Sequence, residues 1–163
     1  MSIRFLSGYW MQGSLRKVDI WHRRGRTLRA MAWLVLARLL VLAVPFSRWR
    51  LSLGGVECPG DTAEPLVGRD DAQRMASQLA GHVERAAWRL PFAIKCLPKA
   101  MALSWMLRRA AVQHCVVIAA RPMKRREPGD ALHAWVEVSG KIVIGDLPGP
   151  WHEIYRAGRQ GVV

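Results

Sequence analysis

The sequence predicts an α+β fold, in which helices pack on a small antiparallel sheet behind a helical N-terminal region. Two stretches, residues 70–89 and 97–111, carry apolar residues at the three- and four-residue spacing of amphipathic helices. Three short apolar or β-branched runs are typical of strands: residues 115–120, 132–138 and 141–145. A chain of 163 residues is long enough to bury one core of its own.

The composition is that of a folded and strongly basic protein. Hydrophobic residues make up 51% of the chain, which excludes intrinsic disorder. The chain has 25 Lys and Arg against 12 Asp and Glu, a net charge of +13 that favours an acidic partner or an anionic surface. Residues 1–50 hold 10 of the basic residues and a single acid, Asp19, so most of the basic excess lies there.

We predict two regions: residues 1–55, which are basic and contain an apolar helix at 30–44, and a core at 66–163. A Gly- and Pro-rich segment, residues 54–65, separates them. Pro45 ends the apolar helix, which would be about 22 Å long and so shorter than the roughly 30 Å hydrocarbon layer of a bilayer. Three placements stay open for this helix: packed into the domain, which we favour, lying on a membrane surface, or crossing a membrane.

A two-residue turn predicts the pairing of the last two strands. Ser139 and Gly140 alone separate the two runs, which is typical of a tight hairpin with a fixed register. Pairing outward from this turn places His133 directly opposite Asp146, with Cβ atoms roughly 4.5–5.5 Å apart. Glu137 shares that face but lies about 13 Å along the strand from His133. Asp146, and not Glu137, is therefore predicted to orient the imidazole.

An oriented histidine is half of a catalytic triad and requires a nucleophile. Cys96 is the best placed of the three cysteines because it stands at the start of the second predicted helix. The helix amides and the neighbouring Lys95 and Lys99 favour a thiolate there. Cys115 lies in an apolar strand and is predicted to pack as a small hydrophobic residue, and Cys58 to be an ordinary thiol.

The cysteine and histidine spacing also predicts what the chain lacks. There is no CxxC and no HxxxH motif, so we expect neither a metal site nor a cofactor. An odd number of cysteines is untypical of a secreted disulfide-rich domain, and no secretory signal peptide is evident. We therefore expect a cytoplasmic protein.

Three segments resemble the transglutaminase-like leader peptidases of lasso-peptide biosynthesis. They are PFAIKCL at residues 91–97, WMLRR at 105–109 and HAWVE at 133–137, and the resemblance extends over roughly residues 30–150. It implies a papain-like cysteine protease core, in which the helix bearing the cysteine packs on a small antiparallel sheet. By this resemblance the catalytic triad consists of the nucleophile, the general base and the orienting acid, namely Cys96, His133 and Asp146.

The resemblance also implies a substrate and partners. Members of this family remove the leader from a ribosomally made precursor peptide before a lasso cyclase closes the ring. Longer relatives carry a winged-helix domain that binds the leader, whereas residues 1–55 show one apolar helix and no three-strand pattern. We therefore expect a separate leader-recognition protein, in a split system.

Two other functions stay open as alternatives without catalytic activity. The basic charge and the arginine cluster at residues 23–26 suggest a nucleic-acid-binding protein, but no DNA-binding motif accompanies them and we expect no nucleic-acid partner. The apolar helix at residues 30–44 suggests a membrane-associated assembly protein.

Overall fold

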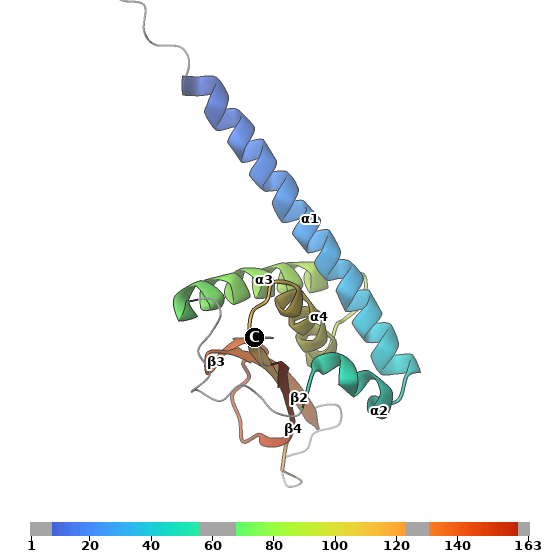
Figure 1. The fold of residues 1–163 in the computed structure, drawn as a ribbon. Coiled ribbons are helices and arrows are strands. Elements are labelled where there is room, and N and C mark those ends of the chain that lie inside the picture. The colour runs from blue at the N-terminus through green and yellow to red at the C-terminus, as the bar shows by residue number, and fades with distance from the viewer. Residues whose placement is uncertain (1–7, 56–67, 123–130, 160–163) are drawn as a thin grey trace, which may run out of the picture.

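The computed structural model describes residues 8–55, 68–122 and 131–159, and it confirms the α+β fold (Figure 1). Most of the predicted linker at residues 54–65 lies outside the described residues. The helices are α1 (Gly8–Ala43), α2 (Phe46–Trp49), the short 3-10 helix η1 (Arg50–Leu53), α3 (Arg69–Arg89) and α4 (Cys96–Arg109). The strands are β1 (His114–Ala120), β2 (Leu132–Val138), β3 (Lys141–Ile144) and β4 (His152–Arg159).

The four strands form one antiparallel sheet in the order β3-β2-β1-β4. The sequence predicted the first three strands but not β4, which pairs with β1 at the far edge from β3. Strand β4 escaped detection because Glu153, Arg156 and Arg159 interrupt its apolar residues. The last strand of the chain thus lies beside the first, a pairing that local sequence patterns do not reveal.

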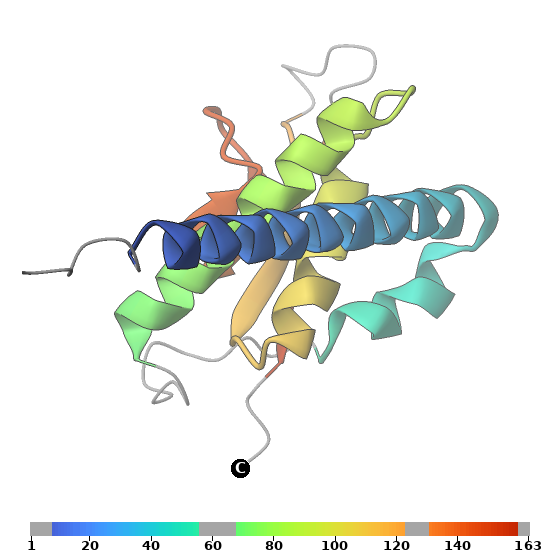
Figure 2. The same cartoon turned by 90° about the horizontal axis from the view of Figure 1, so that it is seen from above.

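The molecule has three layers, visible in Figures 1 and 2: the sheet, then α3 with α4, then α1 across them. One face of the sheet and the inner sides of the helices form the main core. Its members are mainly aliphatic residues that exclude water from both layers, and removing them from water is the main stabilising term. They include Val83, Leu103, Leu107, Val116, Ile118, Val136 and Ala157.

Helix α1 is longer than the predicted apolar helix. It begins at Gly8, because residues 8–29 contain good helix formers and no proline, and it ends at Ala43, just before Pro45. On one side it packs on α3 and α4 through the fully buried Ala30, Leu34 and Ala37. Its first half projects beyond the other elements (Figure 1). Among the described residues, no helix combines the length and apolar character needed to cross a bilayer.

The other two predicted helices are confirmed with small differences. Helix α3 matches its prediction to within one residue, although Met75, which was expected on the apolar side of this helix, is exposed. Helix α4 begins at Cys96 and stops at Arg109, two residues early, because Ala111 adopts a positive φ of 54°.

The β2–β3 hairpin has the predicted turn. Ser139 and Gly140 have φ values of 49° and 73°, and two successive positive values are typical of a type I′ turn. Val138 pairs with Lys141, as predicted. Next to the turn, therefore, the sequence determines the register.

Further from the turn the predicted register is wrong. A bulge shifts the pairing so that Val136 lies opposite Ile144, where β3 ends. The next residue, Gly145, has a φ of 82° and turns the chain out of the strand. The prediction that His133 lies directly opposite Asp146 is therefore a mistake, caused by the extra residue at the bulge.

The cysteines also differ from the prediction. Cys115 is buried, as expected, but it is disulfide-bonded, so its description as a merely packed hydrophobic residue is wrong. Sequence spacing does not show which thiols meet in space. Cys58 lies outside the described residues, and Cys96 is a free thiol.

Candidate active site

Cys96 occupies the first position of α4. The residue before it, Lys95, has an extended backbone, and no side chain caps the helix. The amide groups of this first turn have no partners within the helix and give the helix start a positive electrostatic potential. The side chain is half-buried, and its Sγ lies 4.0 Å from the carbonyl oxygen of Leu132, the residue before His133. The start of α4 therefore holds the thiol beside the first residue of β2.

One cavity of about 260 Å³ collects the three residues predicted to be catalytic, Cys96, His133 and Asp146. They come from the start of α4, from β2 and from the segment after β3. The remaining lining residues are Glu84, Lys99, Ile144 and Gly145. Residues far apart in the chain thus share one hollow at the edge of the sheet.

A backbone carbonyl, and not a carboxylate, holds the imidazole of His133. Its Nε2–H donates to the carbonyl oxygen of Gly145 at 2.6 Å, which places the ring proton on Nε2 because a carbonyl can only accept. The other ring nitrogen, Nδ1, makes no hydrogen bond to a described residue. In the neutral imidazole this nitrogen carries the lone pair.

Gly145 is a site residue that the sequence analysis did not identify. Its φ of +82° favours glycine, and a Cβ there would lie 2.6 Å from the carbonyl oxygen of Ala134 on β2. Glycine alone allows this close approach, which aims its carbonyl at His133. Gly140 and Gly145 can both be seen in the sequence as possible turn residues. The sequence does not show the bulge, which brings the Gly145 carbonyl to His133.

Trp151 covers the imidazole and was also missed. The two rings stack with centroids 4.9 Å apart and planes inclined by 30°. The indole is held by a hydrogen bond from its Nε1–H to the Leu147 carbonyl at 3.0 Å, and the Arg121 guanidinium lies over it at 4.8 Å. This cover leaves His133 only 9% exposed. The stack restricts rotation of the imidazole and excludes water from one of its faces.

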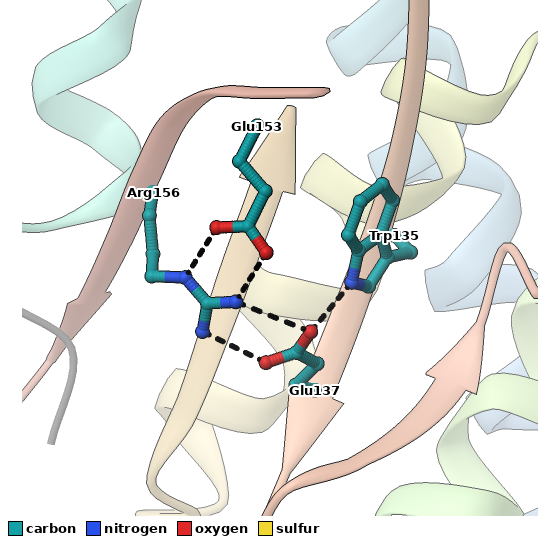
Figure 3. A network of polar contacts seen from close by, with 4 residues as sticks. All are labelled: Trp135, Glu137, Glu153 and Arg156. Atoms are coloured by element: carbon teal, nitrogen blue, oxygen red, sulfur yellow. Dashed lines mark hydrogen bonds and ion pairs between the residues drawn. The ribbon is translucent and has the colours of Figure 1, made fainter. Parts of the chain in front are cut away.

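A polar network fixes the second tryptophan near His133 (Figure 3). The Nε1–H of Trp135, whose ring centroid lies 6.1 Å from that of the imidazole, donates to Glu137 at 2.6 Å. Arg156 donates hydrogen bonds to Glu137 at 2.8 Å and to Glu153 at 2.8 and 3.0 Å, and its bonds to Glu153 lower the pKa of that carboxyl group. Glu137 thus supports Trp135 on the sheet face away from the helices, and it does not contact the imidazole.

An ion pair completes the cavity. The Nζ of Lys99, one turn along α4 from Cys96, lies 2.8 Å from a carboxylate oxygen of Glu84 on α3. Lys99 was predicted to favour the thiolate, and Glu84 offsets part of its charge. No group of three or more His, Cys, Asp or Glu residues in the part of the chain that the structure describes could hold a metal ion.

A comparison with protein families identifies the family of the segment that contains this site. The profile of the Transglutaminase-like superfamily matches residues 40–156, from the end of α1 into β4. The chain belongs to this superfamily. The matched segment contains Cys96, His133 and Asp146, and the superfamily includes cysteine peptidases. Searches of curated proteins and of solved structures gave no match.

Proposed function

We propose that this member of the superfamily is a cysteine peptidase that removes the leader from a lasso-peptide precursor before macrocyclisation. One observation carries the proposal: a free thiol at a helix start lines the same cavity as an imidazole whose Nδ1 has no described hydrogen-bond partner. The three segments that resemble lasso leader peptidases support the choice of substrate, and the superfamily membership supports the chemistry.

In the proposed mechanism His133 Nδ1 takes the proton of Cys96, and the thiolate attacks the scissile carbonyl carbon. The resulting oxyanion accepts a hydrogen bond from the backbone N–H of Cys96. The imidazolium then gives its proton to the leaving amine as the C–N bond breaks, which leaves a thioester. His133 next deprotonates a water molecule that attacks the thioester, and the released thiolate recovers the proton.

Two groups assist His133 in this proposal. The Gly145 carbonyl orients the ring through Nε2, the role predicted from the sequence for a carboxylate. Asp146, the next residue and part of the same cavity, acts as the acid of the triad by stabilising the imidazolium through its negative charge.

The proposal includes partners and a compartment. A separate recognition protein holds the leader and raises its effective concentration at the cavity, and a lasso cyclase consumes the product. We place the reaction in the cytoplasm, where precursor peptides are made. Disulfides are rare in that compartment, so a count of free thiols in freshly lysed cells tests this placement against the bonded Cys115.

Alkylation by iodoacetamide tests the thiol–imidazole pair without a substrate. We expect rapid modification of Cys96, mapped by mass spectrometry, and a rate at least about tenfold lower in His133→Ala, because the thiol loses its proton acceptor. His152→Ala, which removes an exposed imidazole from β4, is the matched control and should react like the wild type. Equal rates for His133→Ala and wild type would contradict the pair.

Cleavage of a lasso precursor peptide tests the substrate. The chain with a leader-recognition protein should release the leader, and Cys96→Ala should not. Without the recognition protein, cleavage should be slow, and the stimulation should decrease with salt because exposed charges are screened. Equal cleavage with and without that protein would disprove the split system, and no cleavage in either case would disprove the substrate.

A further inference from the structure

The outward side of α1 is apolar and exposed over its second half. Leu28, Leu39 and Leu42 are 64%, 56% and 71% exposed, and Val35 and Leu36 are 36% and 42% exposed. We call these five residues the apolar stripe. Isolated exposed leucines are ordinary, but a continuous patch of them on a monomer is typical of an interaction site.

Helix geometry makes the stripe continuous. Successive residues are about 100° apart around the axis, so residues 28, 35, 39 and 42 fall within a sector of about 60°. They extend over about 21 Å along the helix. The buried residues of α1, which contact α3 and α4, lie on the opposite side. Figures 1 and 2 show no other described element over the outward side.

Exposed arginines stand before and after this stripe in the chain. Arg24 and Arg29 lie at its N-terminal end, about 40° and 100° around the helix from Leu28, and Arg48 and Arg50 are exposed shortly after α1 ends. Residues 24–55 contain no Asp or Glu. The surface therefore matches an occupant that is both apolar and negatively charged.

We propose that the apolar stripe binds the surface of an anionic lipid bilayer, with this part of α1 lying in the plane of the membrane. The leucines enter the boundary between headgroups and acyl chains, while the arginines bind lipid phosphates. The helix lies on the bilayer and does not cross it, which agrees with the absence of a spanning helix among the described residues.

The charge argues against a second copy of the chain as the occupant. Two such faces would bring arginines together with no acid to pair with them, at the cost of like-charge repulsion. A protein partner is a poorer match than a bilayer as well, because interface hot spots favour aromatic residues seated in pockets and are depleted in leucine. A single convex helix needs no pocket to lie on a bilayer.

Co-sedimentation of the full chain with lipid vesicles tests the proposal. We expect binding to vesicles of phosphatidylglycerol with phosphatidylcholine and little binding to phosphatidylcholine alone. The double variant Leu39→Gln, Leu42→Gln should bind about tenfold or more weakly, because two apolar side chains no longer enter the bilayer. Ile154→Gln, an equally exposed apolar residue on β4, is the matched control and should bind like the wild type.

The charge is tested separately with Arg24→Gln, Arg29→Gln. Binding should fall by about fivefold for each arginine, and high salt should weaken the wild type in the same way. Circular dichroism and thermal unfolding check that each variant is folded.

Three outcomes would overturn the proposal. The first is failure of the folded wild type to bind anionic vesicles, and the second is equal binding by the leucine variant. The third is a wild type that forms dimers and does not bind vesicles, together with a leucine variant that is monomeric. The last outcome would assign the stripe to a second copy. The proposal does not depend on catalysis, so Cys96→Ala should bind vesicles like the wild type even if no peptide is cleaved.

Discussion

Two buried histidines on neighbouring strands have opposite surroundings. His114, at the start of β1, faces the helices: its Nδ1–H donates to the Val112 carbonyl at 2.9 Å, and its Nε2 accepts from the Ser104 hydroxyl at 2.8 Å. His133, on β2, uses one nitrogen for the Gly145 carbonyl and leaves the other without a described partner, in a cavity with a free thiol.

The difference shows that burial does not identify a functional histidine. Burial lowers the pKa of His114, and the nearby charge of Arg108 lowers it further, while the hydrogen bond to Val112 raises it in part. His114 therefore stays neutral and serves the packing of α4 against β1. What distinguishes His133 is a ring nitrogen without a described partner in the cavity that also holds the free thiol of Cys96.

The largest expected effect separates these two histidines. His133→Ala should reduce kcat/KM for precursor cleavage by about 10³–10⁴ with little change in unfolding temperature, because it removes the proposed general base. His114→Gln should instead lower stability by about 1–3 kcal/mol, since it disturbs two buried hydrogen bonds, and the folded fraction should keep its activity. A loss of catalysis in folded His114→Gln would contradict the assignment of a purely structural role to His114.

The second prediction concerns how His133 is held. Gly145→Ala should reduce kcat/KM by about 10²-fold or more, because its Cβ would clash with Ala134 O and displace the carbonyl that orients the ring. Gly140→Ala, at the other positive-φ glycine of the hairpin, is the control and should cost about 1–2 kcal/mol of stability without changing kcat. Equal catalytic losses in both variants would mean that hairpin stability, and not ring orientation, is what matters.

A smaller effect is expected at the acid. Asp146→Asn should lower kcat/KM by roughly tenfold, because its charge acts on the imidazolium across the cavity while the Gly145 carbonyl still orients the ring. The pH–rate profile should shift with it, which a merely structural role would not cause. Asp71→Asn removes the same charge from the exposed start of α3 and should leave the profile unchanged. A wild-type profile for Asp146→Asn would remove this residue from the triad.

The smallest effect is a pH dependence of stability from His114. Because its pKa is lowered in the folded state, the unfolded chain binds the proton first as pH falls below the ordinary value of about 6.5. Stability should be complete above that pH and decrease below it, by at most about 1.4 kcal/mol per pH unit. The free energy of unfolding, measured with urea across this pH range, should depend less on pH in His114→Gln than in the wild type. The exposed control His152→Gln should keep the pH dependence of the wild type.

The sequence by itself determined the parts of this protein that depend on neighbours in the chain. The periodicity of α3 and α4, the break that places Cys96 at a helix start, and the two-residue turn at Ser139 and Gly140 are local features. Each is specified by backbone preferences within a few residues, so each could be predicted. The same holds for the C-terminal end of α1, which Pro45 imposes.

Only the tertiary structure decided which groups meet. The bulge in β3 moved the partner of His133 from the Asp146 carboxylate to the Gly145 carbonyl, and packing of the chain end beside β1 brought Trp151 onto the imidazole. Tertiary packing also decides that Cys115 forms a disulfide and that one side of α1 is buried while the other is exposed. Such contacts join residues distant in sequence, and they depend on how whole elements pack, which no local pattern of residues records.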